Sequence, residues 1–553
     1  MKQILIFSPI ILMLSCAQEK EPFTREDVQS AQKIIGLQFE GWEIDTMYSY
    51  LLRNRRGYDT MRTYTINHEI APPLLFDPRP DSFVMPESGP DSLHLEMEEV
   101  ELPGSDAGIA FLPVYKLAAL IQSGKMTSSE LTRIYLERLK TYGDTLEAVI
   151  TLTEKTALEQ AARADEEIAN GKYRGYLHGI PYGIKDLFSY PGYPTTWGSF
   201  PYKEQQIEIT AAVIERLEHA GAVLIAKLTS GALARGDVWF GGKTRNPWDL
   251  NQGSSGSSAG AGAAVAAGLV GFAIGTETLG SIISPSSRCG ATGLRPTFGA
   301  VSRYGCMALS WSMDKAGPIC RHALDCAIVL KAIKGEDIRD RTTRQFTLIF
   351  NPATDLGGYK IGYLKEDFER DSSDVSSNKD RTLETLKLLG ANLEEVKLPD
   401  GQPYQVFDII LRAEAGAFFD ELVLSHQDRT MVEQDRGSRA NSLRQSRFIP
   451  AVEYLQANRH RKKLMEAFHE VIKEYDFIIA PTFRSRQSII TNLTGHPAIS
   501  VPDGFDEKGN PTSVTLIGNL FDDGKILEAA YIFQKATDFE ESHPELFMNN
   551  QSN

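Results

Sequence analysis

The segment from Asn246 to Ser281 limits what this 553-residue chain can fold into more than any other, because serines bracket a long run of small residues. Between positions 259 and 268 the sequence contains only alanine, glycine and one valine, and the next residues become apolar up to Ile274. A flexible linker would stay polar. The pattern therefore predicts a closely packed buried helix followed by a short strand, with serines at both open ends.

The serines stand at positions suited to chemistry. Ser257 and Ser258 come just before the predicted helix, beside unpaired backbone N–H groups and the positive end of the helix dipole. Ser281 closes a turn after the predicted strand, and free N–H groups in such a turn can bind an oxyanion. These positions indicate nucleophilic catalysis by a serine.

A serine nucleophile needs a base, and the sequence offers two readings. The stretch 256–260 matches the pattern G-x-S-x-G, which would place Ser258 at a nucleophile elbow. That elbow requires a hydrophobic strand directly before it, whereas residues 246–255 are rich in turn formers. The other reading makes Lys185 the base, because its apolar neighbours favour burial. Lowering its pKa from about 10.4 to about 7 corresponds to about 5 kcal/mol, and the neutral amine could accept a serine proton.

These residues lie in motifs that resemble the amidase signature family. The resemblance extends over roughly the last four fifths of the chain. The matching motifs are HGIPYGIKD (178–186), TTWGS (195–199), NPWDL (246–250), GSSAGAGAAVAAG (256–268), GTETLGSI (275–282), GLRPTFGAVSRYG (293–305), SMDKAGP (312–318) and TNLTGHPAISVP (491–502).

The resemblance implies a Ser-cisSer-Lys triad. Ser281 aligns with the family nucleophile, Ser257 with the bridging serine that follows a cis peptide bond from Gly256, and Lys185 with the family lysine. The implied reaction is acyl transfer from an amide through an acyl-enzyme, with no metal and no organic cofactor. The implied oxyanion donors are the backbone N–H groups of Thr278, Leu279 and Gly280.

Several residues depart from the family pattern, among them Ala259 and Ala261, which stand where the family usually has glycine and serine. Leu279 stands where most members have glycine or a small polar residue, and Ile283 replaces an arginine that often follows the nucleophile. Both are interpreted as effects on specificity. For Asp186, Arg295 and Asp314, buried structural ion pairing is favoured over ordering of the site by hydrogen bonds. For His178 and His496, a structural role in turns is favoured over a catalytic one.

The amino terminus predicts export. Residues 1–15 combine an early lysine with a short apolar run, which is typical of a secretory signal peptide. Leu14-Ser15-Cys16 resembles a bacterial lipobox, which implies lipid attachment to Cys16; an ordinary signal peptide is the alternative. The expected location is the periplasm or a membrane-anchored lipoprotein of a bacterial cell envelope, with the lipid at Cys16 as the sole membrane contact.

Composition limits the partners. The formal net charge of −15 argues against nucleic acid. The remaining cysteines show no standard zinc spacing, and buried thiols are favoured over a disulfide, which an exported context would allow. These cysteines are Cys289, Cys306, Cys320 and Cys326.

The domain pattern follows from shifts in composition. Residues 16–110 are predicted to form an N-terminal helical extension and an acidic, proline-rich linker, and residues 111–545 the amidase domain. The family resemblance implies an α/β fold, namely one α/β/α domain around a large mixed, mostly parallel sheet.

The leading functional hypothesis is hydrolysis of a small-molecule or peptide-terminal amide. Family substrates range from small aliphatic amides to peptide and fatty acid amides. One alternative is a transamidase component that resembles the A subunit of glutamyl-tRNA amidotransferase. Another is a non-catalytic binding protein of the cell envelope.

Overall fold

The computed structural model describes residues 21–548, apart from positions 62, 65–67, 69, 71–73, 88, 94–98, 371–375 and 405–406. The predicted signal peptide and Cys16 lie outside the described residues. The chain divides into two compact units, Met1–Ile70 and Ala71–Asn553. Within the described part of the chain, no helix is both long and apolar enough to cross a membrane.

The smaller unit contains the two helices that the sequence predicts, α1 (Arg25–Ala31) and α2 (Gly41–Met61). Thr24 and Asp27 form a reciprocal capping box that starts α1. The Tyr48 hydroxyl donates to the Phe23 carbonyl oxygen at 2.6 Å, and the two rings meet edge to face. These contacts close the two helices into a hairpin.

The larger unit begins earlier than the predicted boundary at residue 110. The Phe76 ring lies 5.0 Å from that of Phe298, and Lys462 pairs with Asp81 at 2.7 Å. A short parallel pair of strands, β1 (Ser92–Leu93) and β12 (Ile349–Phe350), continues the attachment. The described part of the proline-rich stretch after residue 70 is therefore a strap packed on the larger unit. Its partners lie hundreds of residues away, so composition alone indicated a linker.

One eleven-stranded sheet organises the larger unit. In spatial order its strands are β14 (Leu393–Glu395), β13 (Ile361–Tyr363), β15 (Phe477–Pro481), β17 (Pro511–Gly518), β16 (Ala498–Phe505), β10 (Thr292–Arg295), β11 (Lys315–Cys320), β9 (Phe272–Glu277), β3 (Pro181–Lys185), β4 (Val223–Leu228) and β2 (Val149–Leu152). Two antiparallel ribbons stand outside it, β5 (Val238–Trp239) with β6 (Gly242–Lys243) and β7 (Arg245–Asn246) with β8 (Asp249–Gly253).

The sheet is mixed, as predicted, but the prediction that it is mostly parallel is wrong. The pairs β14/β13, β13/β15, β9/β3 and β3/β4 are parallel, and the other six neighbouring pairs are antiparallel. The antiparallel pair of β10 with β16 joins strands far apart in the sequence, since Gly293 lies opposite Ser500. Local hydrophobic patterns do not encode the direction of such pairs.

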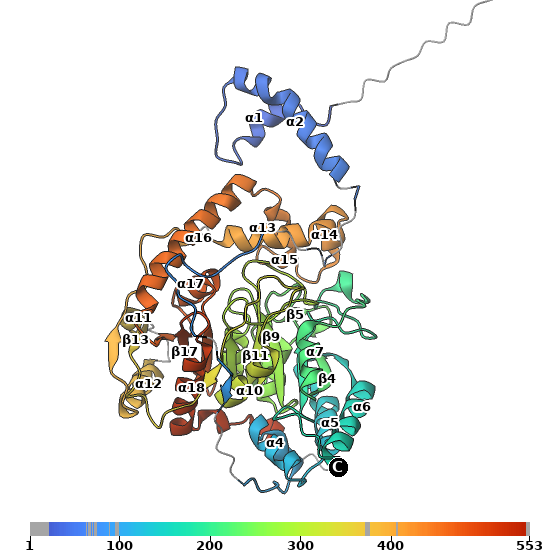
Figure 1. Ribbon diagram of the computed structural model, residues 1–553. Coiled ribbons are helices and arrows are strands. Elements are labelled where there is room, and N and C mark those ends of the chain that lie inside the picture. The colour runs from blue at the N-terminus through green and yellow to red at the C-terminus, as the bar shows by residue number, and fades with distance from the viewer. Residues whose placement is uncertain are drawn as a thin grey trace, which may run out of the picture. The chain divides into compact units, whose positions relative to one another are not determined.

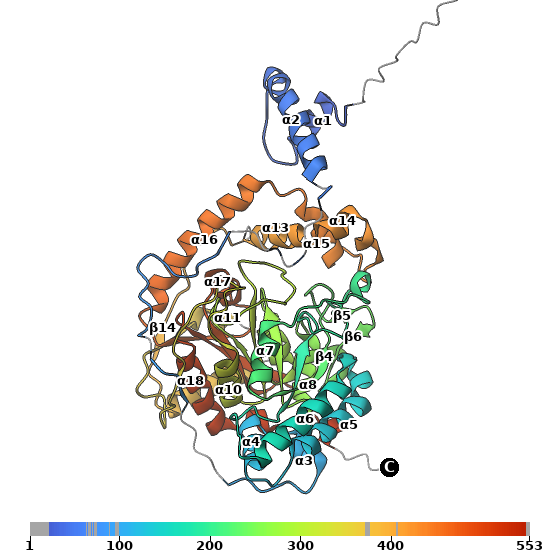
Figure 2. The same ribbon diagram turned by 45° about the vertical axis from the view of Figure 1, so that its right-hand side comes forward.

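The helices of the larger unit surround this sheet. They are α3 (Asp106–Ala110), α4 (Val114–Gln122), α5 (Ser128–Leu146), α6 (Glu154–Ala169), α7 (Ala212–His219), α8 (Ala259–Ala266), α9 (Ile283–Cys289), α10 (Ala323–Ile333), α11 (Lys365–Arg370), α12 (Ser376–Leu388), α13 (Asp408–Phe418), α14 (Asp420–Leu424), α15 (Arg439–Ser446), α16 (Ala451–Ile472), α17 (Gln487–Thr494), α18 (Asp523–Thr537) and α19 (Glu545–Met548). Figures 1 and 2 show α13 to α16 as a helical layer beyond one end of the strands.

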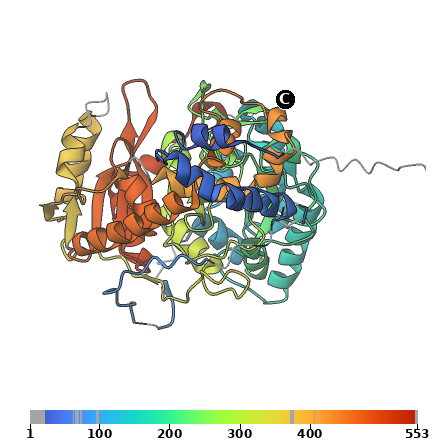
Figure 3. The same cartoon turned by 90° about the horizontal axis from the view of Figure 1, so that it is seen from above.

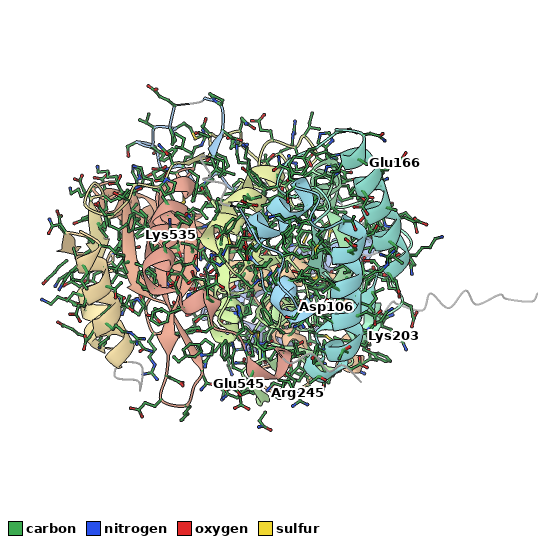
Figure 4. All side chains as sticks on the ribbon, turned by 90° about the horizontal axis from the view of Figure 1, so that it is seen from below. Asp106, Glu166, Lys203, Arg245, Lys535 and Glu545 are labelled. Carbon is green, nitrogen blue, oxygen red and sulfur yellow. The ribbon has the colours of Figure 1, made fainter. Side chains whose placement is uncertain are left out.

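Helices cover both faces of the sheet. On β10, a Cβ at Gly293 would lie 2.2 Å from Ser286 Oγ of α9, whereas the neighbouring Thr292 accepts a hydrogen bond from Gln534 of α18. Successive residues of a strand point to opposite faces, so α9 and α18 lie on opposite sides. Figure 3 shows α5 and α6 (teal) at one edge and the segment around α12 (yellow) at the other. In the view from below, Glu166 of α6 marks the first edge and Lys535 of α18 lies nearer the middle (Figure 4).

The small-residue run forms a buried helix and a strand, as its sequence predicts. Every residue of α8 is buried, and β9 follows it. A Cβ at Gly260 would lie 2.4 Å from both the Ala148 carbonyl oxygen and the Thr229 nitrogen, so only glycine fits there. Close packing thus holds the serine-bearing ends of α8 and β9 in fixed positions.

Candidate active site

Lys185 ends β3 inside the molecule. Its side chain is completely buried, and its Nζ lies 2.8 Å from Ser257 Oγ and 2.8 Å from Thr276 Oγ1. Thr276 belongs to β9, the parallel neighbour of β3. The predicted pair of Lys185 and Ser257 is therefore in direct contact. Sequence reasoning missed Thr276, although its place in the strand ahead of Ser281 was a usable signal.

Burial lowers the pKa of Lys185 to about 7. The cause is desolvation, which disfavours the charged ammonium; nearby Cys306, Asp314 and Glu277 act in the opposite direction. Among the described residues, no carboxylate forms an ion pair with Lys185, and its close partners are hydroxyl groups. Near neutral pH much of the protein therefore carries a neutral amine here, the form that can accept a proton.

The peptide bond between Gly256 and Ser257 is cis. A Cβ at Gly256 would lie 1.8 Å from the carbonyl oxygen of Gly236, so the position accepts no side chain. The Ser257 carbonyl oxygen accepts the N–H of Gly231 at 3.3 Å. The loop after β4 therefore holds the Ser257 backbone in place, while the Ser257 hydroxyl contacts the Lys185 amine.

Ser258 has a different environment from its neighbour. Its hydroxyl donates to the Thr276 carbonyl oxygen and accepts the Thr276 N–H, both at 3.1 Å, which ties α8 to β9. The preceding strand, β8, is a half-exposed polar ribbon and ends at Gly253. The geometry of a nucleophile elbow at Ser258 is therefore absent.

Ser281 lies in the turn between β9 and α9. Its carbonyl oxygen accepts the N–H of Ser258 at 3.1 Å, which brings the nucleophile candidate beside the Ser257–Ser258 pair. Gly280 has a φ of +83°, a conformation that favours glycine, and Leu279 is 41% exposed. Within the described residues, the N–H groups of Leu279, Gly280 and Ser281 have no hydrogen-bond acceptor. The turn can therefore offer donors to an incoming oxyanion.

Glu277 fixes the same turn from inside. Its Oε2 accepts the N–H groups of Ile282 and Ile283 at 2.8 and 3.0 Å, and its Oε1 accepts from Arg295 and Asn492. Burial raises the pKa of Glu277, but Arg295 and the backbone donors outweigh it and hold the pKa at about 2. The carboxylate thus takes up the N–H groups just after Ser281 and leaves those before them free.

Two further carboxylates support the site. Asp314 accepts the Thr278 hydroxyl at 2.5 Å and the N–H groups of Leu309 and Ser310, so it fixes the first residue of the oxyanion turn. Asp186, next to Lys185, forms a completely buried ion pair with Lys227 at 2.7 Å. The predicted ion pairing is thus found for Asp186 and, with Glu277, for Arg295, whereas the contacts of Asp314 are hydrogen bonds that order the site.

The two histidines singled out by sequence contact none of the three candidate catalytic residues. His178 Nε2 lies 3.3 Å from Glu167, and His496 Nδ1 lies 2.8 Å from the Thr494 hydroxyl. All four described cysteines are free, so the structure contains no disulfide between them. No group of three or more His, Cys, Asp or Glu side chains placed to hold a metal ion occurs among the described residues.

Comparison with known proteins matches this site to one family. The family model named Amidase matches residues 130–488, which include all three candidate catalytic residues. The chain belongs to the amidase family. The resemblance stated from sequence is thereby confirmed, as is a mixed α/β fold shared with amidase structures.

Amidase relatives of two kinds are similar to this chain. The A subunit of glutamyl-tRNA(Gln) amidotransferase from Caldanaerobacter subterraneus is 33% identical over 78% of this chain and 97% of that protein. The corresponding protein of Nitrosomonas eutropha is 34% identical over 78% and 98%. Among solved structures, the native peptide amidase of Stenotrophomonas maltophilia is 28% identical, with a TM-score of 0.68 over 77% of this chain and 97% of that chain.

Proposed function

We propose that this amidase-family enzyme hydrolyses a carboxylic amide through an acyl-enzyme on Ser281. The observation that carries the proposal is the contact between the buried Lys185 amine and the Ser257 hydroxyl, beside a turn with free N–H groups. A neutral amine, a hydroxyl relay and an oxyanion site together supply what acyl transfer needs. Small-molecule or peptide-terminal amides are the proposed substrates.

In the proposed reaction, Ser281 Oγ attacks the amide carbonyl carbon while its proton passes to Ser257 and the Ser257 proton passes to Lys185. The N–H groups of Leu279 and Gly280, with that of Thr278, stabilise the resulting oxyanion. The Lys185 ammonium then returns a proton through Ser257 to the leaving nitrogen, and ammonia or an amine departs. Water attacks the acyl-enzyme by the same relay in reverse.

The second candidate is a component of a transamidase, and the 32–34% identity to the A subunits of amidotransferases favours it. That identity spans nearly the whole of those relatives but only 77–79% of this chain. The additional residues here, with the predicted export signal, favour a hydrolase that works without partner subunits. A non-catalytic binding protein would not need the Lys185–Ser257 contact.

A fluorophosphonate probe tests the nucleophile before the substrate is known. We expect an adduct on Ser281, mapped by peptide mass spectrometry, that is retained in Ser258→Ala and lost in Lys185→Ala and Ser281→Ala. An adduct on Ser258 would overturn the proposed triad. Absence of an adduct, with a ligand still bound, would favour a binding protein.

Ammonia release separates the two enzymatic candidates. The purified chain, tested alone on amino acid amides, peptide amides and glutamine, should release ammonia by hydrolysis. The transamidase hypothesis would be favoured if glutamine were the one substrate of this panel to be turned over. It would also be favoured if turnover required added amidotransferase partner subunits. The same panel with matched esters measures the preference for amides over esters.

We also propose export and a lipid anchor at Cys16, on the strength of the sequence of residues 1–16. Expression in a bacterium with a labelled fatty acid tests it. The label should appear in the parent chain and be lost in Cys16→Ser. If neither chain carries the label but the signal segment has been cleaved in the cell, an ordinary signal peptide would be favoured.

A further inference from the structure

The smaller unit exposes a compact group of large apolar side chains. Ile34 is 64% exposed, Ile35 41%, Leu37 54% and Trp42 69%, and we call these four residues the hairpin patch. They lie in or beside the turn that joins α1 to α2. The Leu37 N–H donates to the Gln32 carbonyl oxygen, and the Phe39 N–H donates to the Gln32 side chain at 2.7 Å, so this turn has a closed, defined shape.

The interior of the hairpin has no room for the patch. Ile44 and Tyr48, at 4% and 5% exposure, are the buried apolar residues among the described side chains of this unit. Phe23 and the Arg25 guanidinium cover the Tyr48 ring. A helical pair of this size buries little surface by itself, and several large apolar side chains exposed within one turn region of it mark a site of interaction.

The sequence before the hairpin indicates which partner covers the hairpin patch, namely a lipid bilayer. Cys16, the predicted lipid attachment site, precedes α1 by nine residues, so the start of α1 can be no farther than about 30 Å from it. Indole rings prefer the interface between lipid and water, where the apolar ring and the polar N–H are both accommodated.

We propose that the hairpin patch adsorbs to the surface of a lipid bilayer, in addition to the attachment through the lipid at Cys16. The inference rests on the proposed lipid anchor but not on the proposed reaction. Glu40 and Glu43 flank Trp42, so the attraction is apolar and does not require anionic lipid. The proposal concerns the smaller unit and leaves the catalytic site of the larger unit unchanged.

Brominated-lipid quenching of tryptophan tests the contact in the parent patch, with a conservative aromatic exchange as its control. The chain from residue 16 onward, carrying Cys16→Ser to remove the lipid, is mixed with vesicles of brominated or ordinary phosphatidylcholine. We expect quenching that disappears in Trp42→Phe, because the other tryptophans belong to the larger unit. Quenching equal in both proteins, or in neither, would overturn the proposal.

Vesicle flotation measures the strength of the contact. Replacing Ile34, Ile35 and Leu37 by serine should lower partitioning into phosphatidylcholine vesicles at least about tenfold, because burial of each aliphatic side chain contributes to adsorption. Ile338→Ser is the matched control, since Ile338 is 90% exposed in the larger unit and should not change partitioning. A single Leu37→Ser variant, expected to give a smaller loss in the same direction, guards against misfolding of the triple variant.

Two results would overturn the inference in favour of another partner. Flotation only with phosphatidylglycerol present would mean that charge, not the patch, drives binding. A concentration-dependent dimer in sedimentation, abolished by the triple substitution, would mean that a second copy covers the patch. If labelling at Cys16 fails but Trp42 is still quenched, the anchor proposal falls while the bilayer contact stands.

Discussion

Replacing Lys185 by methionine should stabilise the protein at neutral pH while abolishing activity. Burial lowers the pKa of Lys185 from 10.5 to about 7, a difference that corresponds to about 5 kcal/mol. Between pH 7 and 10.5 the unfolded chain binds one more proton at this lysine than the folded chain does. The free energy of unfolding of the parent therefore rises with pH across this window by about 1.4 kcal/mol per pH unit. The methionine variant lacks this contribution.

The magnitude at one pH combines two effects. Methionine removes the penalty of burying an amine, about 5 kcal/mol at pH 7 or below, but it also leaves the Ser257 and Thr276 hydroxyls without their partner, at about 1 kcal/mol or more each. A net gain of about 2 kcal/mol at pH 7 is expected. The hydrogen-bond loss does not titrate in this range, so the change with pH isolates the lysine.

Urea unfolding followed by circular dichroism at pH 7, 8, 9 and 10 measures this difference. The advantage of Lys185→Met should shrink by about 1.4 kcal/mol per pH unit, vanish near about pH 8.5 and reverse above it. Lys331→Met, at an exposed position on α10, is the control and should show no such trend. A difference between parent and Lys185→Met that stays constant over this pH range would refute the claim that burial, rather than a charged partner, sets the pKa of Lys185.

Three further predictions concern activity and packing. The kcat/KM for an amide should fall about tenfold per pH unit below pH 7 and level off above it, because protonation of Lys185 removes the base; a profile that is flat down to pH 5 would contradict this. Glu277→Gln removes the negative charge that pairs with Arg295 and weakens the hydrogen bonds that fix the oxyanion turn. The kcat should therefore fall about tenfold to a hundredfold with little change in KM. A rise in KM alone would instead indicate a loss of substrate binding. Asp186→Asn leaves the Lys227 ammonium buried without its carboxylate partner. Urea titrations should show the free energy of unfolding lowered by about 3 to 5 kcal/mol. A change below about 1 kcal/mol would mean that the ion pair is dispensable.

Short-range patterns in the sequence predicted structure well. Thr127 and Glu130 match the Thr-x-x-Glu sequence pattern of a capping box, and both of its hydrogen bonds, each spanning three residues, form at the start of α5. The run of small residues correctly predicted the buried helix α8 and the strand β9, because close packing requires alanine and glycine at regular positions. The shifted pKa of Lys185 was also predictable, because its apolar neighbours precede it directly along β3.

Features that depend on distant residues were missed. Asn492 lies 215 positions from the Glu277 carboxylate to which it donates, so no local pattern linked the two. The strap residue Asp81 pairs with Lys462, 381 positions away, and composition alone indicated a free linker. The same limit explains the error over sheet direction, since β10 pairs antiparallel with β16 across some two hundred residues.

Burial alone does not identify the base, because three lysines are buried near the site. Lys227 forms an ion pair with Asp186 and donates to the Pro194 carbonyl oxygen and the Thr195 hydroxyl, and Lys315 donates to the oxygens of Asn492. Burial lowers the pKa of all three, and that of Lys315 lies well below the ordinary lysine value. The Asp186 carboxylate favours the charged form of Lys227, and the Asn492 oxygens beside Lys315 have no proton to give, whereas the Ser257 hydroxyl beside Lys185 has one and, in the proposed relay, regains it from Ser281.

The partner of each amine therefore decides its role, and a matched pair of variants tests this. Lys315→Met should retain fluorophosphonate labelling of Ser281 and lose less than about tenfold in kcat, because it removes a buried donor without breaking the proton relay. Lys185→Met should lose at least about a thousandfold, because no other group can take the Ser257 proton. If the two variants lost activity equally, the contact between Lys185 and Ser257 would not explain catalysis, and the buried lysines would act together through their effect on the oxyanion turn.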